Sequence, residues 1–442
     1  MKQKIFYISY IVAVLLGLWL LFFCMFHRDE TIAADVTKQS DDLDYAKQLE
    51  EYVSRKFAFR KEVIATYTSL QQRFFASSPV KDVIIGEEGY LFYEDTVADY
   101  SGLNRWNDRE LYTVAKTLEL MGESVAADGG RFLLLIAPNK NSLYDYMPYN
   151  YRKRTEPSNA ERLLTALEHV DYVNLFDLFK NREKELYFKT DTHWSDEGAY
   201  YVYEAAQQAL AQEPIRFLEQ DYAAEKSMVG DLSNMLYPDC GPTEETLVFE
   251  EPGYEFLTRT RSFEQNYIET VCVAGANRLL MFRDSFVNNL IGYFSESYEH
   301  AVYDKSLPYD LTQQSKHGSN VVIVEIAERN MGEILAMAPV MSAPKREKIN
   351  GVEVEDLWEA FNVTEANGFI RISGTLQKQY TSPETDIYAR VNGTLYELTP
   401  VSSENSLYGF EGYVATEKSE QLSVVVVAGD TVWEQTYVGQ KE

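Results

Sequence analysis

The sequence contains few of the residues that bind metal ions or cross-link a chain. Its 442 residues include only 3 cysteines and 5 histidines, and no cysteine or histidine cluster has the spacing of a zinc or iron site. Cys24 lies in an apolar run near the N-terminus, so Cys240 and Cys272 are the only pair beyond it, and they allow one disulfide or two separate thiols. We therefore expect no cofactor and no metal ion.

Clusters of basic residues are lacking as well. The chain has 41 Lys and Arg against 69 Asp and Glu, which gives a formal net charge of −28. A surface of this charge repels polyphosphates, so we expect no nucleic-acid partner. Tyrosine, in contrast, is abundant, with 32 copies. It suits sugar contact, because its ring stacks on sugar faces while its hydroxyl hydrogen-bonds, and it equally suits the core of a β domain.

The N-terminus carries a long apolar run. Residues 5–26 contain no charge and follow Lys2 and Lys4, and about twenty apolar residues are enough to cross a bilayer as a helix. A cleavable signal peptide is the alternative, but the run is long for one and ends in bulky residues. We predict a cytoplasmic tip and an uncleaved single-pass anchor within 1–28, a polar stalk over 29–41, and the bulk of the chain on the extracellular or periplasmic side of the cell membrane.

Helical and strand patterns alternate over residues 42–342. Two helices are expected within 42–75 and a short hairpin over 83–93. Strands are then expected at 132–136, 172–175, 278–282 and 321–326, and helices near 107–127, 158–169 and 196–211. Because continuous apolar strands are buried on both faces, the pattern predicts an α/β domain with a parallel sheet covered by helices.

The pattern changes near residue 345. Residues 343–348 are expected to form a linker, and residues 351–442 show short alternating runs separated by turn signals such as Asn392-Gly393. Apart from a short helix expected near 354–361, no helical periodicity continues. We predict a separate antiparallel β domain over 351–442, a small sandwich.

Two segments contain candidate catalytic residues. Ser285 lies where a buried strand is expected to turn into a helix, a position that exposes a hydroxyl beside free backbone N–H groups. His193 is the best-placed base to activate it, and Asp191 can orient the imidazole ring. The alternative interpretations are structural: Asp284 or Ser285 caps one helix, and Asp191 or Ser195 caps the other.

Six segments, in this order, resemble a known family. They are Val83–Tyr93, Ala137–Lys140, Asp191–Trp194, Gly230–Leu236, Arg283–Phe286 and Val324–Asn330. Together they resemble the DHHW and alginate O-acetyltransferase-like proteins, which contain SGNH hydrolase-like domains, and the third segment is similar to their Asp-x-His-Trp signature. Two positions depart from the pattern. Thr192 replaces the first histidine of the signature, and Arg283 stands where SGNH enzymes usually have glycine, so that it either crowds the turn or contacts an anionic substrate.

The resemblance implies an SGNH-like, flavodoxin-like three-layer α/β/α core that is circularly permuted. In this arrangement Asp191 and His193 precede Ser285, with Ser285 as nucleophile, His193 as base and Asp191 as the residue that orients the base. Further residues of the matched segments are expected to bind substrate or to form the oxyanion site, namely Tyr93, Lys140, Trp194, Arg283 and Asp284.

The resemblance also implies an extracytoplasmic O-acetyltransferase that modifies a cell-surface or secreted polysaccharide through an acetyl-serine intermediate. Because cytosolic acetyl-CoA does not reach the outer face of the membrane, a membrane acyltransferase of the MBOAT type is expected to supply the acetyl group. The alternatives are a carbohydrate esterase with the same triad and a non-catalytic glycan-binding or assembly protein.

Overall fold

The computed structural model describes residues 78–238, 240–249, 252–260, 262–349, 353–356, 361–366, 368–403, 406–415 and 421–437, with residues 15, 17 and 66–68. Apart from residues 15, 17 and 66–68, which are helical, the predicted anchor, stalk and paired helices lie outside the described residues. Within the part of the chain that is described, no helix has the length and apolar character needed to cross a membrane. Two compact units form, residues 1–80 with 233–241 and residues 81–232 with 242–442, and the candidate site residues all belong to the second.

A seven-stranded sheet forms the centre of the α/β domain. Its strands, in spatial order, are β4 (Tyr172–Val173), β3 (Arg131–Ala137), β11 (Val321–Ala327), β9 (Arg278–Phe282), β10 (His300–Asp304), β8 (Tyr267–Val271) and β7 (Glu255–Phe256). The first five run parallel, which confirms the predicted parallel sheet, although β10 was not among the predicted strands, and β8 and β7 extend the sheet antiparallel. This edge was not predicted, because β8 alternates half-buried and buried residues instead of forming a continuous apolar run.

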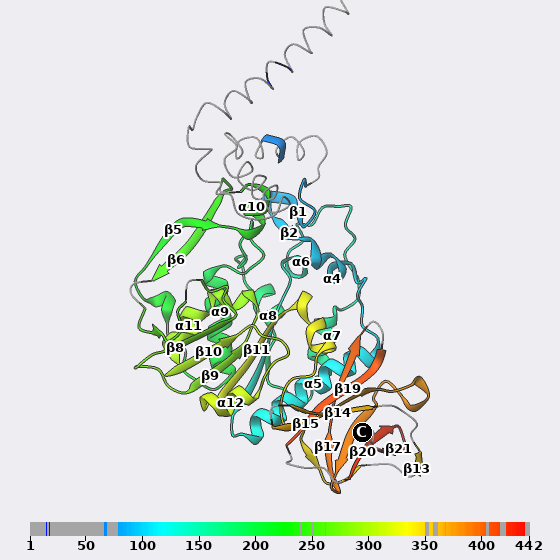
Figure 1. The fold of residues 1–442 in the computed structure, drawn as a ribbon. Helices are drawn as coiled ribbons and strands as arrows, with labels where there is room; N and C mark the ends of the chain where they lie inside the picture. The colour runs from blue at the N-terminus through cyan, green and yellow to red at the C-terminus, as the bar shows by residue number, and fades with distance from the viewer. Residues whose placement is uncertain are drawn as a thin grey trace, which may run out of the picture. The chain divides into compact units, whose positions relative to one another are not determined.

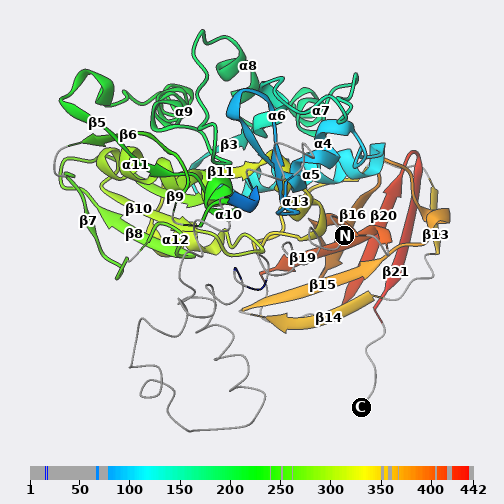
Figure 2. The same ribbon diagram turned by 90° about the horizontal axis from the view of Figure 1, so that it is seen from above.

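Helices cover both faces of this sheet (Figures 1 and 2). One layer contains α8 (Leu175–Lys180), α9 (Asp196–Ala209) and α11 (Ile291–Ser297), and the other contains α5 (Asp108–Ala127) and α7 (Asn159–Ala166). Leu133 and Leu135 of β3 pack in the first layer, whereas Leu134 and Ile136 pack in the second. This alternation follows because successive side chains of a strand point to opposite faces.

The predicted helices are confirmed with shifted ends. Helix α5 begins where the Asn107 side chain accepts a hydrogen bond from the Glu110 N–H (3.0 Å), while the Glu110 carboxylate accepts one from the Asn107 N–H (2.8 Å). Helix α7 ends at Ala166, earlier than predicted, and the short α8 was not predicted.

Cys272 is buried, and its thiol donates a hydrogen bond to the Gly253 carbonyl (3.3 Å), which supports separate thiols.

The remaining elements of this region lie outside the central sheet and its main helices. With η for 3-10 helices, they are β1 (Val83–Ile85), η1 (Glu87–Gly89), β2 (Leu91–Tyr93), η2 (Glu94–Thr96), α4 (Val97–Ser101), α6 (Lys140–Leu143), η3 (Phe217–Glu219), β5 (Tyr222–Val229), α10 (Asp231–Leu236), β6 (Thr243–Phe249), η4 (Ser285–Asn289), α12 (Thr312–His317), η5 (Glu328–Asn330) and α13 (Gly332–Ala336). The predicted hairpin over 83–93 is confirmed by the antiparallel pair of β1 and β2.

The C-terminal region forms a β-sandwich. One sheet contains, in spatial order, β12 (Lys345–Arg346), β17 (Thr394–Glu397), β16 (Asp386–Val391), β20 (Leu422–Ala428), β21 (Thr431–Thr436) and β13 (Glu353–Asp356), and the other contains β14 (Phe361–Ala366), β15 (Phe369–Thr375), β19 (Ser406–Val414) and β18 (Thr399–Ser403), with η6 (Lys378–Tyr380) between β15 and β16. Ile372 and Val424, one from each sheet, are fully buried in a shared core. The two sheets thus pack face to face.

Two predictions for this region are wrong. The helix expected near 354–361 is a strand where it is described, because β13 pairs in parallel with β21. The linker expected over 343–348 contains β12, which pairs with β17. Arg346 in this segment forms ion pairs with Glu397 (2.5 Å) and Glu123 (2.7 Å), so the segment is held by both the sandwich and helix α5.

Candidate active site

Ser285 lies at the turn after β9. Asp284 caps this turn, because its Oδ1 accepts a hydrogen bond from the Phe286 N–H (2.9 Å). The serine hydroxyl is therefore not needed as the cap, and its oxygen lies 2.8 Å from His193 Nε2. A 3-10 turn follows the serine, and α11 begins only at Ile291, later than the helix predicted from the sequence.

His193 connects the serine to Asp191. Its Nδ1 lies 2.6 Å from Asp191 Oδ1, which also accepts a hydrogen bond from the His193 N–H (2.9 Å). The other carboxylate oxygen accepts a hydrogen bond from the Asp231 N–H (2.7 Å). Ser195 caps the next helix by accepting from the Gly198 N–H (3.2 Å), so Asp191 is not its cap. The three predicted side chains thus lie together in the order that a catalytic triad requires.

Lys140 holds the loop that carries the acid and the base of this triad. Its buried ammonium group donates hydrogen bonds to the carbonyls of Phe188 (3.0 Å), Lys189 (3.0 Å) and Asp191 (2.6 Å). The three donors of the ammonium group are thereby matched by three acceptors. Burial lowers the pKa of Lys140 to about 8, although the charge of Asp191 opposes the shift. Lys140 positions the loop, in place of the substrate contact predicted for it.

Two carboxylates set the electrostatics around His193. Burial favours a higher pKa for Asp191, but its hydrogen bond to His193 and the charge of that ring outweigh burial and hold the pKa at about 2. Burial likewise opposes a charge on His193, but the hydrogen bond and charge of Asp191 keep the pKa of His193 above its ordinary value. Asp231 lies 4.0 Å from His193 Nδ1 and adds negative charge. The site therefore favours uptake of a proton by His193.

Two residues predicted to contact substrate are buried instead. Trp194 is fully buried in the core, with its ring centroid 4.8 Å from that of Phe286. Arg283 is also buried and donates hydrogen bonds to the carbonyls of Phe263 (2.7 Å) and Gln265 (2.8 Å). Trp194 directly follows His193, and neighbours along an extended chain point to opposite sides. Arg283 lies two residues before Ser285, and its guanidinium is held by the loop of Phe263 and Gln265. The predicted contacts of both residues are therefore wrong.

Asp284 has a structural role as well. Besides capping the serine turn, its Oδ2 accepts hydrogen bonds from the Ala327 N–H (2.8 Å) and from the Asn330 side chain (3.0 Å). These bonds tie the serine turn to the end of β11. The capping interpretation of Asp284 is thus confirmed, and its carboxylate is occupied by the protein.

Arg329 is a cation beside the triad to which the sequence analysis gave no role. Its guanidinium lies 5.3 Å from the centroid of the Phe286 ring and 5.6 Å from that of Tyr93. The Phe286 ring in turn lies 4.8 Å from the His193 ring. Arg329 is half-buried and forms no ion pair or hydrogen bond with any residue that the structure describes. The only feature of the sequence that pointed to Arg329 was its place in the matched segment Val324–Asn330. Tyr93 lies beside the triad through its contact with the Arg329 guanidinium.

A cavity of about 510 Å³ adjoins the serine turn. Asn288 and Asn289, which follow Ser285 in η4, form part of its wall. Five aromatic side chains also line it, namely Phe217, Phe249, Tyr254, Phe263 and Tyr293, and so do the carboxylates of Asp196 and Glu296. Its volume falls in the range of ligand pockets, and apolar walls with a few amides are typical of them.

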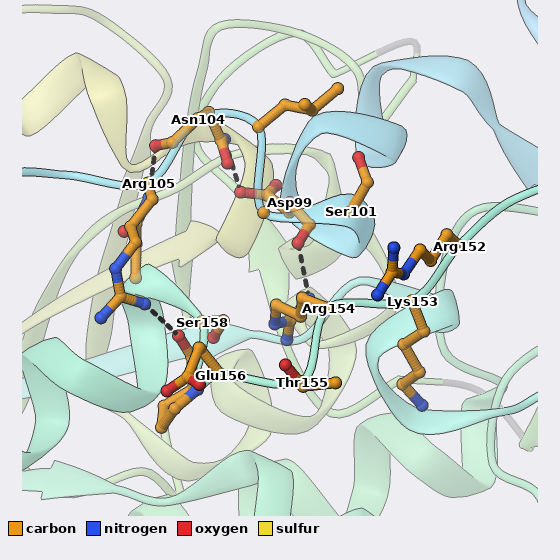
Figure 3. Close-up of a pocket in the computed structure, with 14 residues that line it drawn as sticks. Asp99, Ser101, Asn104, Arg105, Arg152, Lys153, Arg154, Thr155, Glu156 and Ser158 are labelled. Atoms are coloured by element: carbon orange, nitrogen blue, oxygen red, sulfur yellow. Dashed lines mark hydrogen bonds between the residues drawn. The ribbon is translucent and has the colours of Figure 1, made fainter.

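A second cavity, of about 430 Å³, is lined by cations. Arg105 lies on one side, and Arg152, Lys153 and Arg154 lie on the other (Figure 3). Lys153 is paired with an aspartate, and Arg154 lies 3.7 Å from each of two glutamates. This basic cavity suits an anionic group, but no residue of the triad lines it.

The triad also offers ligands for a metal ion. Asp191, His193 and Asp231 present ligand atoms within 4.8 Å of one another. However, His193 holds Ser285 and Asp191 at ordinary hydrogen-bond distances, and Asp231 accepts hydrogen bonds from the Thr192 N–H and hydroxyl. These contacts favour proton transfer over metal binding at this site.

We predict that Asp191→Asn lowers the pKa of His193, because the charge and hydrogen bond that raise it are both weakened. An NMR titration of the His193 ring in the wild type and the variant measures this directly. A base must be neutral to accept a proton, so activity of the wild type rises with pH through the raised pKa, and the midpoint moves to lower pH in the variant. An unchanged or higher pKa in the variant contradicts the assigned role of Asp191.

One family model matches part of the chain. The family model described as the SGNH hydrolase-like domain of the acetyltransferase AlgX matches residues 83–272, which include Asp191 and His193. No curated protein matches the chain significantly.

Similar solved structures are all distant. A DHHW family protein from Eubacterium siraeum is 14% identical with TM-score 0.42, and the match covers 49% of this chain and 85% of that protein. PatB1 from Bacillus cereus with a sulfonyl adduct is 15% identical with TM-score 0.45, and the match covers 56% of this chain and 97% of PatB1. The O-acetyltransferase domain of AlgJ from Pseudomonas putida is 16% identical, with TM-score 0.37, covering 56% and 91%. The family match over residues 83–272 confirms that this part of the chain resembles the SGNH hydrolase-like domain of the alginate O-acetyltransferase-like proteins.

Proposed function

We propose that the chain is an extracytoplasmic O-acetyltransferase that acetylates a cell-surface or secreted polysaccharide through Ser285, His193 and Asp191. The observation that carries the proposal is the position of the imidazole, with one nitrogen 2.8 Å from the serine oxygen and the other 2.6 Å from the carboxylate. The match of residues 83–272 to an acetyltransferase domain supports the reaction class.

The proposed cycle has two acyl transfers. His193 takes the proton of the Ser285 hydroxyl as Oγ attacks the acetyl carbonyl, and then returns the proton to the leaving group of the donor. This leaves an acetyl-serine. A sugar hydroxyl, deprotonated by His193, attacks the acetyl-serine, and the proton passes back to Ser285 Oγ as the ester bond breaks. If water replaces the sugar, the same steps make the protein an esterase.

Two groups beside the serine can stabilise the negative oxygen formed at each attack. The Ser285 N–H donates no hydrogen bond to a described residue and lies at the start of the η4 turn. Arg329 adds a positive charge close to the His193 ring. We assign the oxyanion contact to the amide, and to Arg329 the attraction of a negatively charged donor or acceptor.

We further propose that the core is a circularly permuted flavodoxin-like fold. If the parallel strands are counted from β9 as β9, β10, β11, β3 and β4, their spatial order β10-β9-β11-β3-β4 reads 2-1-3-4-5. That order is the flavodoxin-like order. In this count the serine follows the first strand, which explains how Asp191 and His193 come earlier in the chain.

The location and the partner are proposals from the sequence. A span over residues 5–26 would hold the site outside the membrane, beside an MBOAT-type acyltransferase that passes acetyl groups across it. The acceptor is a polysaccharide, and the aromatic cavity beside the serine turn is its proposed binding site.

Ser285→Ala should abolish hydrolysis of p-nitrophenyl acetate by the full chain in detergent, with a loss of roughly 10³-fold or more. Intact mass spectrometry should show one added acetyl group on the wild type and none on the variant. Ser315→Ala, an exposed serine on α12, is the matched control and should keep full activity. Activity that persists in Ser285→Ala, or a wild type inactive even toward acetylated oligosaccharides, contradicts the enzyme assignment and favours the glycan-binding alternative.

Tyr254→Ala should raise KM for an oligosaccharide acceptor by about 2- to 12-fold, the worth of one aromatic contact, and leave hydrolysis of p-nitrophenyl acetate unchanged. Arg152→Ala, in the basic cavity, is the control and should leave both unchanged. If Arg152→Ala raises KM while Tyr254→Ala does not, the acceptor binds in the basic cavity instead.

Deletion of the cognate MBOAT-type acyltransferase should abolish acetylation of the polysaccharide in cells, because the Ser285 site would have no acetyl donor. Ester-bound acetate released by mild base from the purified polymer measures the effect, with the Ser285→Ala strain as reference. Wild-type acetate levels in the deletion strain refute the dependence on this partner.

A further inference from the structure

A carboxylate and two imidazoles meet at a place remote from the triad. Glu269 lies in β8, His300 is the first residue of β10, and His317 is the last residue of α12. One ligand atom from each lies within 4.8 Å of the others. We propose that Glu269, His300 and His317 bind a divalent transition-metal ion of the zinc type, with one coordination position left for water.

The backbone places these three side chains together. Glu269 pairs with Val302 across the antiparallel strands β8 and β10, so His300, two residues before Val302, projects from the same face of the sheet as Glu269. Helix α12 ends at His317, whose carbonyl accepts a hydrogen bond from Arg278 Nε (2.8 Å) at the start of β9. Two strands and a helix end therefore hold the ligands, which is a more rigid support than a loop.

The distances fit a metal ion after small movements. His300 Nε2 lies 2.6 Å from Glu269 Oε1, and His317 Nδ1 lies 3.9 Å from the same oxygen. Two tetrahedral ligands, each about 2.0–2.2 Å from zinc, are roughly 3.3–3.5 Å apart. The observed distances lie on either side of this value. In the metal-bound form the ion takes the place of the direct contact between His300 Nε2 and Glu269 Oε1.

The cluster is partly buried in the fold. His300 is only 5% exposed, and its Nε2 is the ring nitrogen that faces Glu269. Its Nδ1 lies on the other side of the ring and has no hydrogen-bond partner among the described residues. Glu269 and His317 are half-buried, so the site can be reached from solvent. Two imidazoles and one carboxylate form a donor set that suits zinc and its neighbours in the transition series.

The surrounding charges are mixed. Arg278 lies 3.4 Å from Glu299, and its positive charge is partly offset there. The Tyr267 hydroxyl lies 3.4 Å from His317 Nε2 and donates a hydrogen bond to Glu269 Oε2 (3.4 Å), so it holds two of the three ligands from outside. Glu269 thus supplies the main negative charge for the ion.

The site lies where β9 and β10 begin, beside α12 (Figure 1), whereas Ser285 follows the other end of β9. Its proposed role is to tie β8, β10 and α12 together, independently of acetyl transfer.

The test uses the full chain in detergent, stripped of metal with a chelator and then titrated with Zn²⁺ by calorimetry. His317→Ala should weaken binding by roughly 100-fold or more, because the loss of outer partners alone costs 10- to 100-fold. His169→Ala, an exposed histidine outside the cluster, is the matched control and should bind as the wild type does. Saturating Zn²⁺ should raise the Tm of the wild type and the control but not that of His317→Ala.

Two further variants make the result specific. Glu269→Gln keeps the size of the side chain, so it tests the site even if His317→Ala fails to fold. His193→Ala removes the metal ligand of the triad, and Zn²⁺ should still bind this variant. Absence of Zn²⁺ binding to the folded wild type overturns the proposal, as does binding that is lost in His193→Ala but retained in His317→Ala and Glu269→Gln.

Discussion

The geometry of the triad depends on one buried charge, the ammonium group of Lys140. A cation removed from water is stable only where hydrogen bonds replace its hydration, and the carbonyls of Phe188, Lys189 and Asp191 supply them. These carbonyls belong to the loop that carries His193. The shape of that loop is therefore set by the need to solvate an ion. Asp191 is held twice, by its carbonyl through Lys140 and by its carboxylate through the imidazole, so its side chain cannot turn away without breaking the other contacts.

The serine turn is held by acidic groups instead. The Asp284 carboxylate accepts hydrogen bonds from both its own turn and the end of β11, and the Asp284 N–H donates to Glu325 Oε2 (3.2 Å). Glu325 is completely buried within β11, and burial, with the charge of Asp284, raises its pKa well above the ordinary range. A neutral carboxyl avoids the cost of an isolated buried charge. Lys140 thus holds the loop of His193, whereas Asp284 and Glu325 hold the turn of Ser285. The loop and the turn meet near the carboxyl ends of the parallel strands, where α/β folds bind ligands.

The parts of the site that could be predicted lie beside strong local signals. Ser285 follows an apolar strand, and His193 precedes the start of a helix, so both could be placed on loops at the edge of a sheet. The supporting contacts could not be predicted, because Lys140 and Asp191 are 51 residues apart and periodicity carries no information on such pairs. Trp194 was misplaced for the same reason, since its neighbour in the sequence, His193, faces Ser285 while the Trp194 ring packs in the core. In the sandwich, β13 was misread because its pairing with β21 spans most of the domain.

Arg283 connects the nucleophile turn to the wall of the aromatic cavity. Its guanidinium donates hydrogen bonds to the carbonyls of Phe263 and Gln265 and to Asn288 Oδ1 (2.8 Å), and both Phe263 and Asn288 line that cavity. A glycine, usual at this position in SGNH enzymes, could make none of these bonds. The sequence alone left Arg283 as either a crowded turn or a substrate contact. In the fold three hydrogen bonds of Arg283 join the turn that carries Ser285 to the loop that shapes the cavity, so the residue that departs from the family pattern supports the wall of the cavity.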